Sequence, residues 1–253
     1  MALNSYYLFD MDGTLTPKRQ PMTEEFTKNF LEWAKTHDFS IVSGSDFAKI
    51  KEQIPNEILE QCDFIFACAG NHTIQILFDG NLEENISEIE SSKQTETLIN
   101  FLKFEANYSN WPGRKFNINI EKRHGMINFS TVGREAPTPI RNQYEEWDNH
   151  DGERKRICSY INERFSDFEA SIGGQISIDI VLRGKDKRQV LDYLPLSTHC
   201  ISFYGDKVNG GNDEALAKRI EELGCGFSYN VDCPEHLSSF LFKTEEDNSQ
   251  AVV

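Results

Sequence analysis

The chain has 253 residues, of which 41 are acidic and 26 basic, so that its formal charge is −15, and 38% of its residues are hydrophobic. This composition is typical of a soluble globular protein, and a chain of this length can bury one large core or two modest ones. The excess of acidic residues disfavours nucleic acids and anionic membranes as partners, because both would be repelled.

The sequence predicts neither a membrane segment nor an export signal. A run of about 18 apolar residues does not occur, and residues 1–5 lack the basic and apolar regions of a signal peptide. The six cysteines are scattered without a CxxC pair, which favours free thiols over a disulfide framework or a zinc site. We therefore expect a cytoplasmic protein.

Strand and helix patterns alternate at the start of the chain. Residues 6–9 form a short aromatic and apolar run that predicts a buried strand, and residues 23–36 predict an amphipathic helix capped by Thr23. A second strand is expected at 39–42, followed by a helix that ends near Gln53. Strands joined by helical crossovers run parallel and bring their carboxyl ends to one edge of the sheet.

The pattern changes in the middle of the chain. A helix is expected near 94–106. Apolar and polar residues then alternate in three segments, which predicts an antiparallel sheet with one apolar and one polar face; the segments are 116–121, 126–130 and 176–180. We expect helices at 139–148 and 153–165 to cover the apolar face and to leave the polar face open.

Strand–helix alternation returns near Lys187, where a helix is expected to begin. Strands at 200–204 and 227–231 then flank a helix that runs from Gly210 to Leu223. The predicted fold class is α/β, a doubly wound parallel-sheet core with an inserted α+β cap. We assign residues 1–81 and 185–253 to the core, with a disordered tail at 244–253, and residues 82–184 to the cap.

Polar groups that suit phosphoryl chemistry follow the predicted parallel strands. Asp10 and Asp12 follow the first strand, and two carboxylates in an extended loop can approach one centre, where one attacks as a nucleophile and the other handles protons. Ser43 follows the second strand. Together with Lys187, it would cradle a phosphoryl group.

Further oxygen ligands come from another strand end. Asp206 and Asp213 lie in Gly-Asp-Lys and Gly-Asn-Asp sequences after the strand at 200–204. With Asp10 and Asp12 they provide hard oxygen donors without clustered histidine or cysteine, which indicates Mg²⁺.

The predicted polar face of the insert carries a candidate site for a second phosphate. Arg123, Arg134 and Arg141 line its rim, and guanidinium groups bind phosphate with two parallel hydrogen bonds. Ser177 and Asp179, on the same face, can bind sugar hydroxyls.

This order of groups resembles the haloacid-dehalogenase-like superfamily of phosphotransferases. The resemblance implies that Asp10 is the nucleophile, Asp12 the general acid/base, and Ser43 and Lys187 the pair that stabilises the phosphoryl group. It also implies that Asp10, Asp206 and the main-chain carbonyl of Asp12 hold Mg²⁺, with Asp213 in the same acidic motif.

Longer motifs resemble the eukaryotic-type phosphomannomutase family, in collinear order from about residue 6 to 240. They are Phe9–Thr16 with Arg19-Gln20, Ser43–Phe47, Arg123–Asn128, Val132–Arg134, Ser171–Asp179 and Asp186–Arg188. The resemblance implies interconversion of mannose 6-phosphate and mannose 1-phosphate, with Mg²⁺, a hexose 1,6-bisphosphate activator and a homodimer formed through the cap. The substrate-binding residues that it implies are Arg19, Arg123, Arg134, Arg141, Gly174, Gln175, Ser177 and Asp179.

Three departures from the family pattern keep other functions open. Residues 217–222 predict a plain helix where the family has a loop for a second cation, and residues 68–71 lack the family's acidic residue. Ser43 stands where the mutases commonly have glycine and the wider phosphatase superfamily has serine or threonine. The alternatives are therefore a sugar-phosphate phosphatase and a non-catalytic sugar-phosphate-binding protein. The substrate could also include glucose phosphates.

Overall fold

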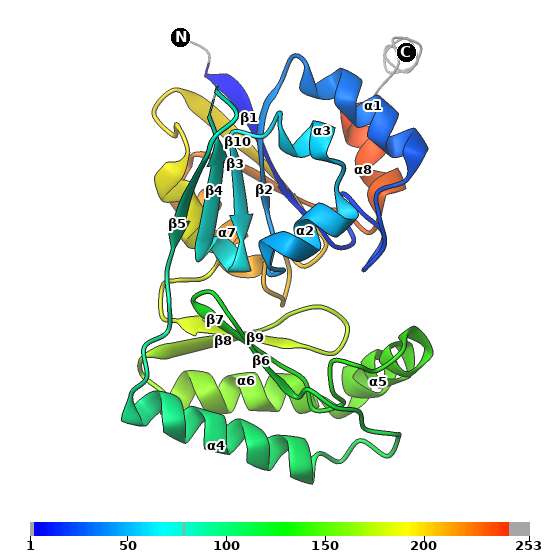
Figure 1. Ribbon diagram of the computed structural model, residues 1–253, viewed down its shortest axis with the longest axis vertical. Coiled ribbons are helices and arrows are strands. Elements are labelled where there is room, and N and C mark those ends of the chain that lie inside the picture. The colour runs from blue at the N-terminus through cyan, green and yellow to red at the C-terminus, as the bar shows by residue number, and fades with distance from the viewer. Residues whose placement is uncertain (1–2, 78, 243–253) are drawn as a thin grey trace.

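The computed structural model describes residues 3–77 and 79–242, so the tail expected at 244–253 lies outside the described residues. Its larger sheet has seven strands in the order β11-β10-β1-β2-β3-β4-β5, and it lies in the upper part of the molecule in Figure 1. The strands from β11 to β3 run parallel, whereas β4 and β5 add to the edge in antiparallel fashion. Their bounds are Asn4–Asp10 for β1, Asp38–Val42 for β2, Phe64–Ala67 for β3, His72–Ile76 for β4, Leu82–Ile86 for β5, His199–Gly205 for β10 and Gly226–Asn230 for β11.

Helices cover both faces of this sheet, which confirms the doubly wound arrangement. One apolar cluster joins α1 (Glu24–Ala34), α2 (Phe47–Gln53), α3 (Asn56–Leu59) and α8 (Pro234–Leu241) to one face. A second cluster joins η2 (Lys187–Tyr193) and α7 (Glu214–Leu223) to the other face. We call this sheet with its helices the core. The helix predicted at 23–36 is confirmed, since the Thr23 hydroxyl accepts a hydrogen bond from the Phe26 amide at 3.3 Å.

The smaller sheet is antiparallel and has the order β6-β7-β9-β8. Its strands are β6 (Ile120–Arg123), β7 (Met126–Phe129), β8 (Phe168–Ile172) and β9 (Ile178–Leu182). Helices α4 (Lys93–Tyr108) and α6 (Glu153–Arg164) pack on its apolar face, and the opposite face is turned toward the core (Figure 1). We call this sheet with α4, α5 (Thr138–Asp151) and α6 the cap.

The cap differs from expectation in three respects. The predicted helix at 139–148 does not cover the apolar face: α5 packs beside the sheet around Trp111 and Tyr144, and α4 takes its place. The strand predicted at 116–121 begins only at Ile120, because Ile118 adopts a left-handed backbone conformation with φ 58°. The face expected to be polar also carries Met126 and Val181, which pack with core residues.

Several elements of the core were not predicted. They are strands β3, β4 and β5, helices α3 and α8, and the short η1 (Cys68–Gly70). Strand β5 pairs with β4 over Leu82–Ile86. The core sheet therefore includes residues that we expected at the start of the insert. None of the described helices is long and apolar enough to cross a membrane.

Candidate active site

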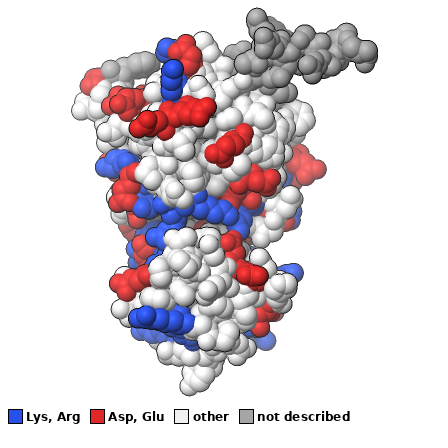
Figure 2. All heavy atoms as spheres, turned by 90° about the vertical axis from the view of Figure 1, so that its right-hand side faces the viewer, with Lys and Arg blue, Asp and Glu red and all other residues white. Residues whose placement is uncertain are grey.

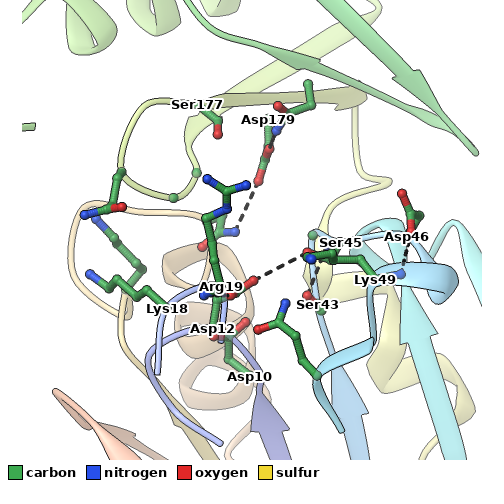
Figure 3. A pocket seen from close by; sticks show the side chains of 18 of the residues that line it. Asp10, Asp12, Lys18, Arg19, Ser43, Ser45, Asp46, Lys49, Ser177 and Asp179 are labelled. Carbon is green, nitrogen blue, oxygen red and sulfur yellow. Dashed lines mark hydrogen bonds between the residues drawn. The ribbon is translucent and has the colours of Figure 1, made fainter. Parts of the chain in front are cut away.

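A polar cavity of about 300 Å³ lies between the cap and the carboxyl ends of the core strands (Figure 3). All of the predicted site residues except Lys187 and Asp213 line it. Basic side chains gather at this level of the molecule, between core and cap (Figure 2). The structure thus brings together residues that are far apart in this acidic chain.

Asp10 is the last residue of β1 and is buried against Lys187. The Lys187 ammonium donates hydrogen bonds at 2.6 Å to Asp10 Oδ1 and at 2.6 Å to Asp213 Oδ1, and Lys187 is only 1% exposed. Asp186 caps η2 and so fixes the start of the helix that carries this lysine. Burial raises the pKa of Asp10, while the charge of Lys187 opposes the rise. The Lys187 ammonium thus stabilises the charged form of a carboxylate whose charge burial disfavours.

Three carboxylates of the core, two of which line the cavity, could hold a cation. One oxygen each of Asp10, Asp206 and Asp213 lies within 4.8 Å of the others. Burial, and then the charge of Asp213, raises the pKa of Asp206 to about 6. Gly13 allows this approach, because its φ is +93° and an added Cβ would lie 2.8 Å from Asp206 Oδ2. The donor set fits Mg²⁺, since it consists of hard oxygens whose mutual repulsion a divalent cation would relieve.

The Asp12 carboxylate points into the cavity from the loop after β1 (Figure 3). Its Oδ1 accepts a hydrogen bond from the main-chain N–H of Arg19 at 2.8 Å, and its Oδ2 accepts one from the Ser45 hydroxyl at 3.4 Å. Arg19 adopts a left-handed conformation, with φ 61°, which costs a non-glycine residue about 1 kcal/mol. The strained backbone directs the amide of Arg19 to Asp12, and its side chain lines the same cavity.

Ser43 follows directly after β2 and is 2% exposed. Its amide donates to the Phe66 carbonyl at 2.8 Å, which fixes the end of the strand, and its hydroxyl accepts from the Ser45 amide at 3.0 Å. The hydroxyl retains its own proton as a donor. It lines the cavity, as does Asp10.

Two arginines of the cap, Arg134 and Arg141, line the cavity. Arg134 donates to Ser177 Oγ at 2.9 Å, and Arg141 is held by the main-chain carbonyls of Arg134 and Ala136. Burial lowers the pKa of both side chains, and the nearby charge of Arg19 lowers it further. Mutual repulsion among three guanidinium groups is relieved by an anion, so this region suits a phosphate.

Arg123 has a different environment. Its Nη1 donates to the Gly44 carbonyl of the core at 2.7 Å, and its Nη2 donates to Glu121 Oε2 at 2.7 Å. The charge of Glu121 raises the pKa of Arg123 against the effect of burial. Arg134 Nε shares the same Glu121 oxygen at 3.2 Å, so Arg123 differs in its bond to Gly44, which ties the cap to the core.

The segment before β9 supplies the remaining predicted residues. Asp179 accepts hydrogen bonds from Asn128 of the cap at 2.6 Å and from Asn212 of the core at 3.2 Å. The Gln175 amide donates to Asn142 and Glu145 of α5, at 2.8 and 3.1 Å. The Gly174 carbonyl accepts from Arg154 at 2.6 Å.

Several residues that line the cavity were not predicted to do so; they include Lys18, Ser45, Gln53, Glu121, Asn128, Lys207 and Asn212. Ser45, Lys207 and Asn212 lie within the sequence motifs, whereas nothing local marks Gln53.

Comparison with protein families places this cavity in a known context. The family model described as eukaryotic phosphomannomutase matches residues 26–242. The chain belongs to the eukaryotic phosphomannomutase family. A phosphomannomutase of Spinacia oleracea is 36% identical over 234 residues, covering 90% of each chain. Phosphomannomutase 1 of Dictyostelium discoideum is 34% identical and covers 94% of this chain and 95% of its own.

Family membership makes the chain an enzyme that interconverts mannose 6-phosphate and mannose 1-phosphate. Solved structures of much lower identity share its fold. An IMP-nucleotidase of Plasmodium falciparum gives a TM-score of 0.63 at 13% identity, covering 94% of this chain and 67% of that one. SMU.1108c of Streptococcus mutans gives 0.59 at 13% identity, covering 98% and 99%. The haloacid-dehalogenase-like fold is thereby confirmed.

Proposed function

We propose that this enzyme moves the phosphoryl group of mannose phosphate through a phospho-aspartate at Asp10. The main support for this proposal is the buried ion pair at the end of β1, in which Lys187 Nζ lies 2.6 Å from Asp10 Oδ1. An Asp10 oxygen bonds to phosphorus as the bond between phosphorus and the sugar oxygen breaks. Lys187 and the Ser43 hydroxyl stabilise the charge on the transferring group.

Asp12 is the proposed general acid/base. It protonates the sugar oxygen that leaves phosphorus, and it removes the proton from the sugar hydroxyl that later attacks phospho-Asp10. Between the two transfers the sugar 1,6-bisphosphate must reorient in the cavity, so that its other phosphate faces Asp10. Transfer of that phosphate then returns Asp10 to its phosphorylated form. A hexose 1,6-bisphosphate is accordingly the proposed activator, because it can charge Asp10 at the start.

The cap is proposed to bind the phosphate that does not react. Arg134, Arg141 and Arg19 supply the positive charge, and Arg123 holds the cap against the core. Ser177, Asp179, Gly174 and Gln175 would bind the sugar. Glucose phosphates fit the same groups, since the epimers differ in the orientation of one hydroxyl.

We assign the cation site to Asp10, Asp206, Asp213 and the main-chain carbonyl of Asp12, with Mg²⁺ as the cation. Mg²⁺, when bound, neutralises charge on the phosphoryl oxygens. The helix predicted over 217–222 is confirmed as part of α7, where Lys218 pairs with Glu214 at 2.6 Å. We therefore propose no second cation there.

We further propose a cytoplasmic homodimer joined through the cap. The cap exposes large apolar side chains, among them Phe104, Tyr108, Ile118 and Tyr160, and burial of such groups favours association. All six cysteines are free thiols, which suits a reducing compartment. Sedimentation at several protein concentrations would test the dimer, and a monomer at every concentration would exclude it.

One observation favours a second activity, hydrolysis. Ser43 brings a hydroxyl to a position where the mutases commonly have glycine, and a phospho-aspartate that is stabilised for longer can be attacked by water. A sugar-phosphate phosphatase on the same scaffold is therefore the alternative to the mutase. The two share the phospho-Asp10 intermediate and differ in what accepts the phosphoryl group.

Labelling of Asp10 tests the covalent mechanism. Wild-type protein quenched in acid after mixing with Mg²⁺ and ³²P-labelled glucose 1,6-bisphosphate should carry label, and Asp10→Asn should carry none while losing at least about 10³-fold in kcat. Asp38→Asn is the control for the loss of one negative charge, because Asp38 is an exposed carboxylate at the start of β2. This variant should retain both the label and the wild-type kcat. Label on folded Asp10→Asn would contradict the mechanism.

A further inference from the structure

Gln53 is a buried amide at the end of α2 whose side chain reaches the loop after β1. The residue is 3% exposed, and it also lines the cavity. One end of its amide faces three oxygens: Asp12 Oδ1 at 3.3 Å, Thr16 Oγ1 at 3.2 Å and the Gln20 carbonyl at 2.9 Å. Its main-chain carbonyl accepts a hydrogen bond from the Met22 amide at 2.8 Å. The same residue thus binds the loop at both ends.

The chemistry of these oxygens fixes the orientation of the amide. A carboxylate and a main-chain carbonyl only accept, so the group that faces them must be the NH₂. One of its two protons can go to the Gln20 carbonyl, and the other can be shared between Asp12 Oδ1 and Thr16 Oγ1. The Thr16 hydroxyl is satisfied as well, because its own proton can go to the Met11 carbonyl at 3.3 Å.

Asp12 is consequently held by donors from three separate segments of the core. The Arg19 amide comes from its own loop, the Ser45 hydroxyl from the turn after β2, and the Gln53 amide from the far end of α2. Asp46 caps the start of that helix, and its carboxylate accepts from the Lys49 amide at 2.8 Å. Helix α2 is therefore a rigid arm of two turns, and its last side chain sets the position of a carboxylate in the cavity.

We infer that Gln53 is a positioning residue that holds the Asp12 carboxylate in line for proton transfer in both phosphoryl-transfer steps. The inference rests on the proposed role of Asp12 as general acid/base. Proton transfer is sensitive to geometry, and a displacement of about 1 Å can cost about 100-fold in rate. Gln53 itself does not exchange a proton with the sugar.

A double-mutant cycle tests the inference. Gln53→Met keeps the length of the side chain and removes the donors, and Gln53→Asn keeps the amide but withdraws it from Asp12. Either variant should lower the single-turnover rate of sugar phosphorylation from ³²P-labelled phospho-enzyme about 10- to 100-fold, with KM for mannose 1-phosphate changed less than about threefold. In the Asp12→Asn background, Gln53→Met should change the residual rate less than about threefold, because the group that it positions is gone.

The same data separate failure of the inference from failure of the proposed function. If Gln53→Met lowers the rate equally in wild type and in Asp12→Asn, or raises KM in place of lowering the rate, Gln53 acts on the fold or the substrate and the inference is overturned. If Asp12→Asn alone retains the wild-type rate, the proposed role of Asp12 is wrong and the inference falls with it. Circular dichroism shows which variants are folded, and the Asn variant serves if the Met variant is not.

Discussion

Asp206 is a residue of the proposed cation site that lowers the free energy of unfolding of the metal-free protein. Its carboxylate is buried beside Asp10 and Asp213, within 4.8 Å of both, and burial raises its pKa to about 6. Lys18 Nζ lies 3.4 Å from Asp206 Oδ2, but Lys18 is partly exposed, so its charge offsets only part of the rise in the pKa of Asp206. A charge in this position destabilises the metal-free protein and favours binding of a cation.

The pH dependence of stability follows from this shift. Since the pKa of Asp206 is higher in the folded than in the unfolded chain, the folded chain binds more protons between pH 3.8 and about 6, and stability falls as pH rises through that range. The carboxylate contributes a penalty of up to about 3 kcal/mol at pH 7.5. In EDTA, Asp206→Asn should therefore unfold at higher urea concentration than wild type at pH 7.5, and the difference should shrink at pH 5. A difference that is equal at both pH values would contradict the assignment.

Arg19 combines two roles that a substitution can separate. Its left-handed backbone, with φ 61°, presents an amide to Asp12, while its guanidinium adds charge near Arg134 and Arg141. Asparagine tolerates this conformation and a β-branched residue does not.

We expect Arg19→Asn and Arg19→Val to weaken binding of mannose 1-phosphate alike, by about 10- to 100-fold, because both lack the guanidinium. Only the Val variant should lose stability, by about 1–2 kcal/mol relative to Asn. Calorimetric titration and urea denaturation measure the two quantities. Equal stabilities of the two variants would show that the backbone at residue 19 is not strained.

Among the elements, helix α6 supports the loop before β9, which we propose to bind the sugar. Arg154 donates to Asp148 of α5 at 2.6 Å and to the Gly174 carbonyl at 2.6 Å, and both charged side chains are almost fully buried. This ion pair ties two helices to the loop before β9. A buried pair of this kind contributes little beyond an apolar pair, but loss of one partner is costly.

Arg154→Met should destabilise the protein by about 3–5 kcal/mol, because Asp148 is left buried without its partner. Lys155→Met, on the exposed side of the same helix, is the matched control and should cost less than about 1 kcal/mol. Replacing both partners, with Asp148→Leu and Arg154→Met, should recover much of the loss. If the two single Met variants are equally stable in urea, the pair does not support this loop.

Whether an element could be predicted from the sequence depended on how its two faces are buried. Strand β1 and helix α1 were recognisable because a continuous apolar run and a regular helical period each describe a single environment. Strand β5 was not, since all of its residues are exposed and Leu82 and Ile86 lie at a sheet edge. Strand β7 is buried on both faces, because Ile127 and Phe129 pack under the cap helices while Met126 packs on the core.

For the whole molecule, the sequence predicted the members of the site better than their partners. Asp10 and Ser43 could be found because each lies at the carboxyl end of a parallel strand, where such a sheet gathers polar groups. The contacts that close the cap on the core could not be found in this way. They join Arg123 to Gly44, Asn212 to Asp179, and Arg188 to Glu169 at 2.7 Å, and such pairings depend on how two sheets face each other.

These contacts matter for the proposed mutase reaction, because a cap held over phospho-Asp10 excludes water and leaves the sugar as the acceptor of the phosphoryl group. Phosphorus NMR of the protein with Mg²⁺, mannose 1-phosphate and a trace of glucose 1,6-bisphosphate tests this directly. We expect the ester signal to move from mannose 1-phosphate to mannose 6-phosphate with little release of inorganic phosphate. Accumulation of inorganic phosphate without the second ester would contradict it and would establish a phosphatase.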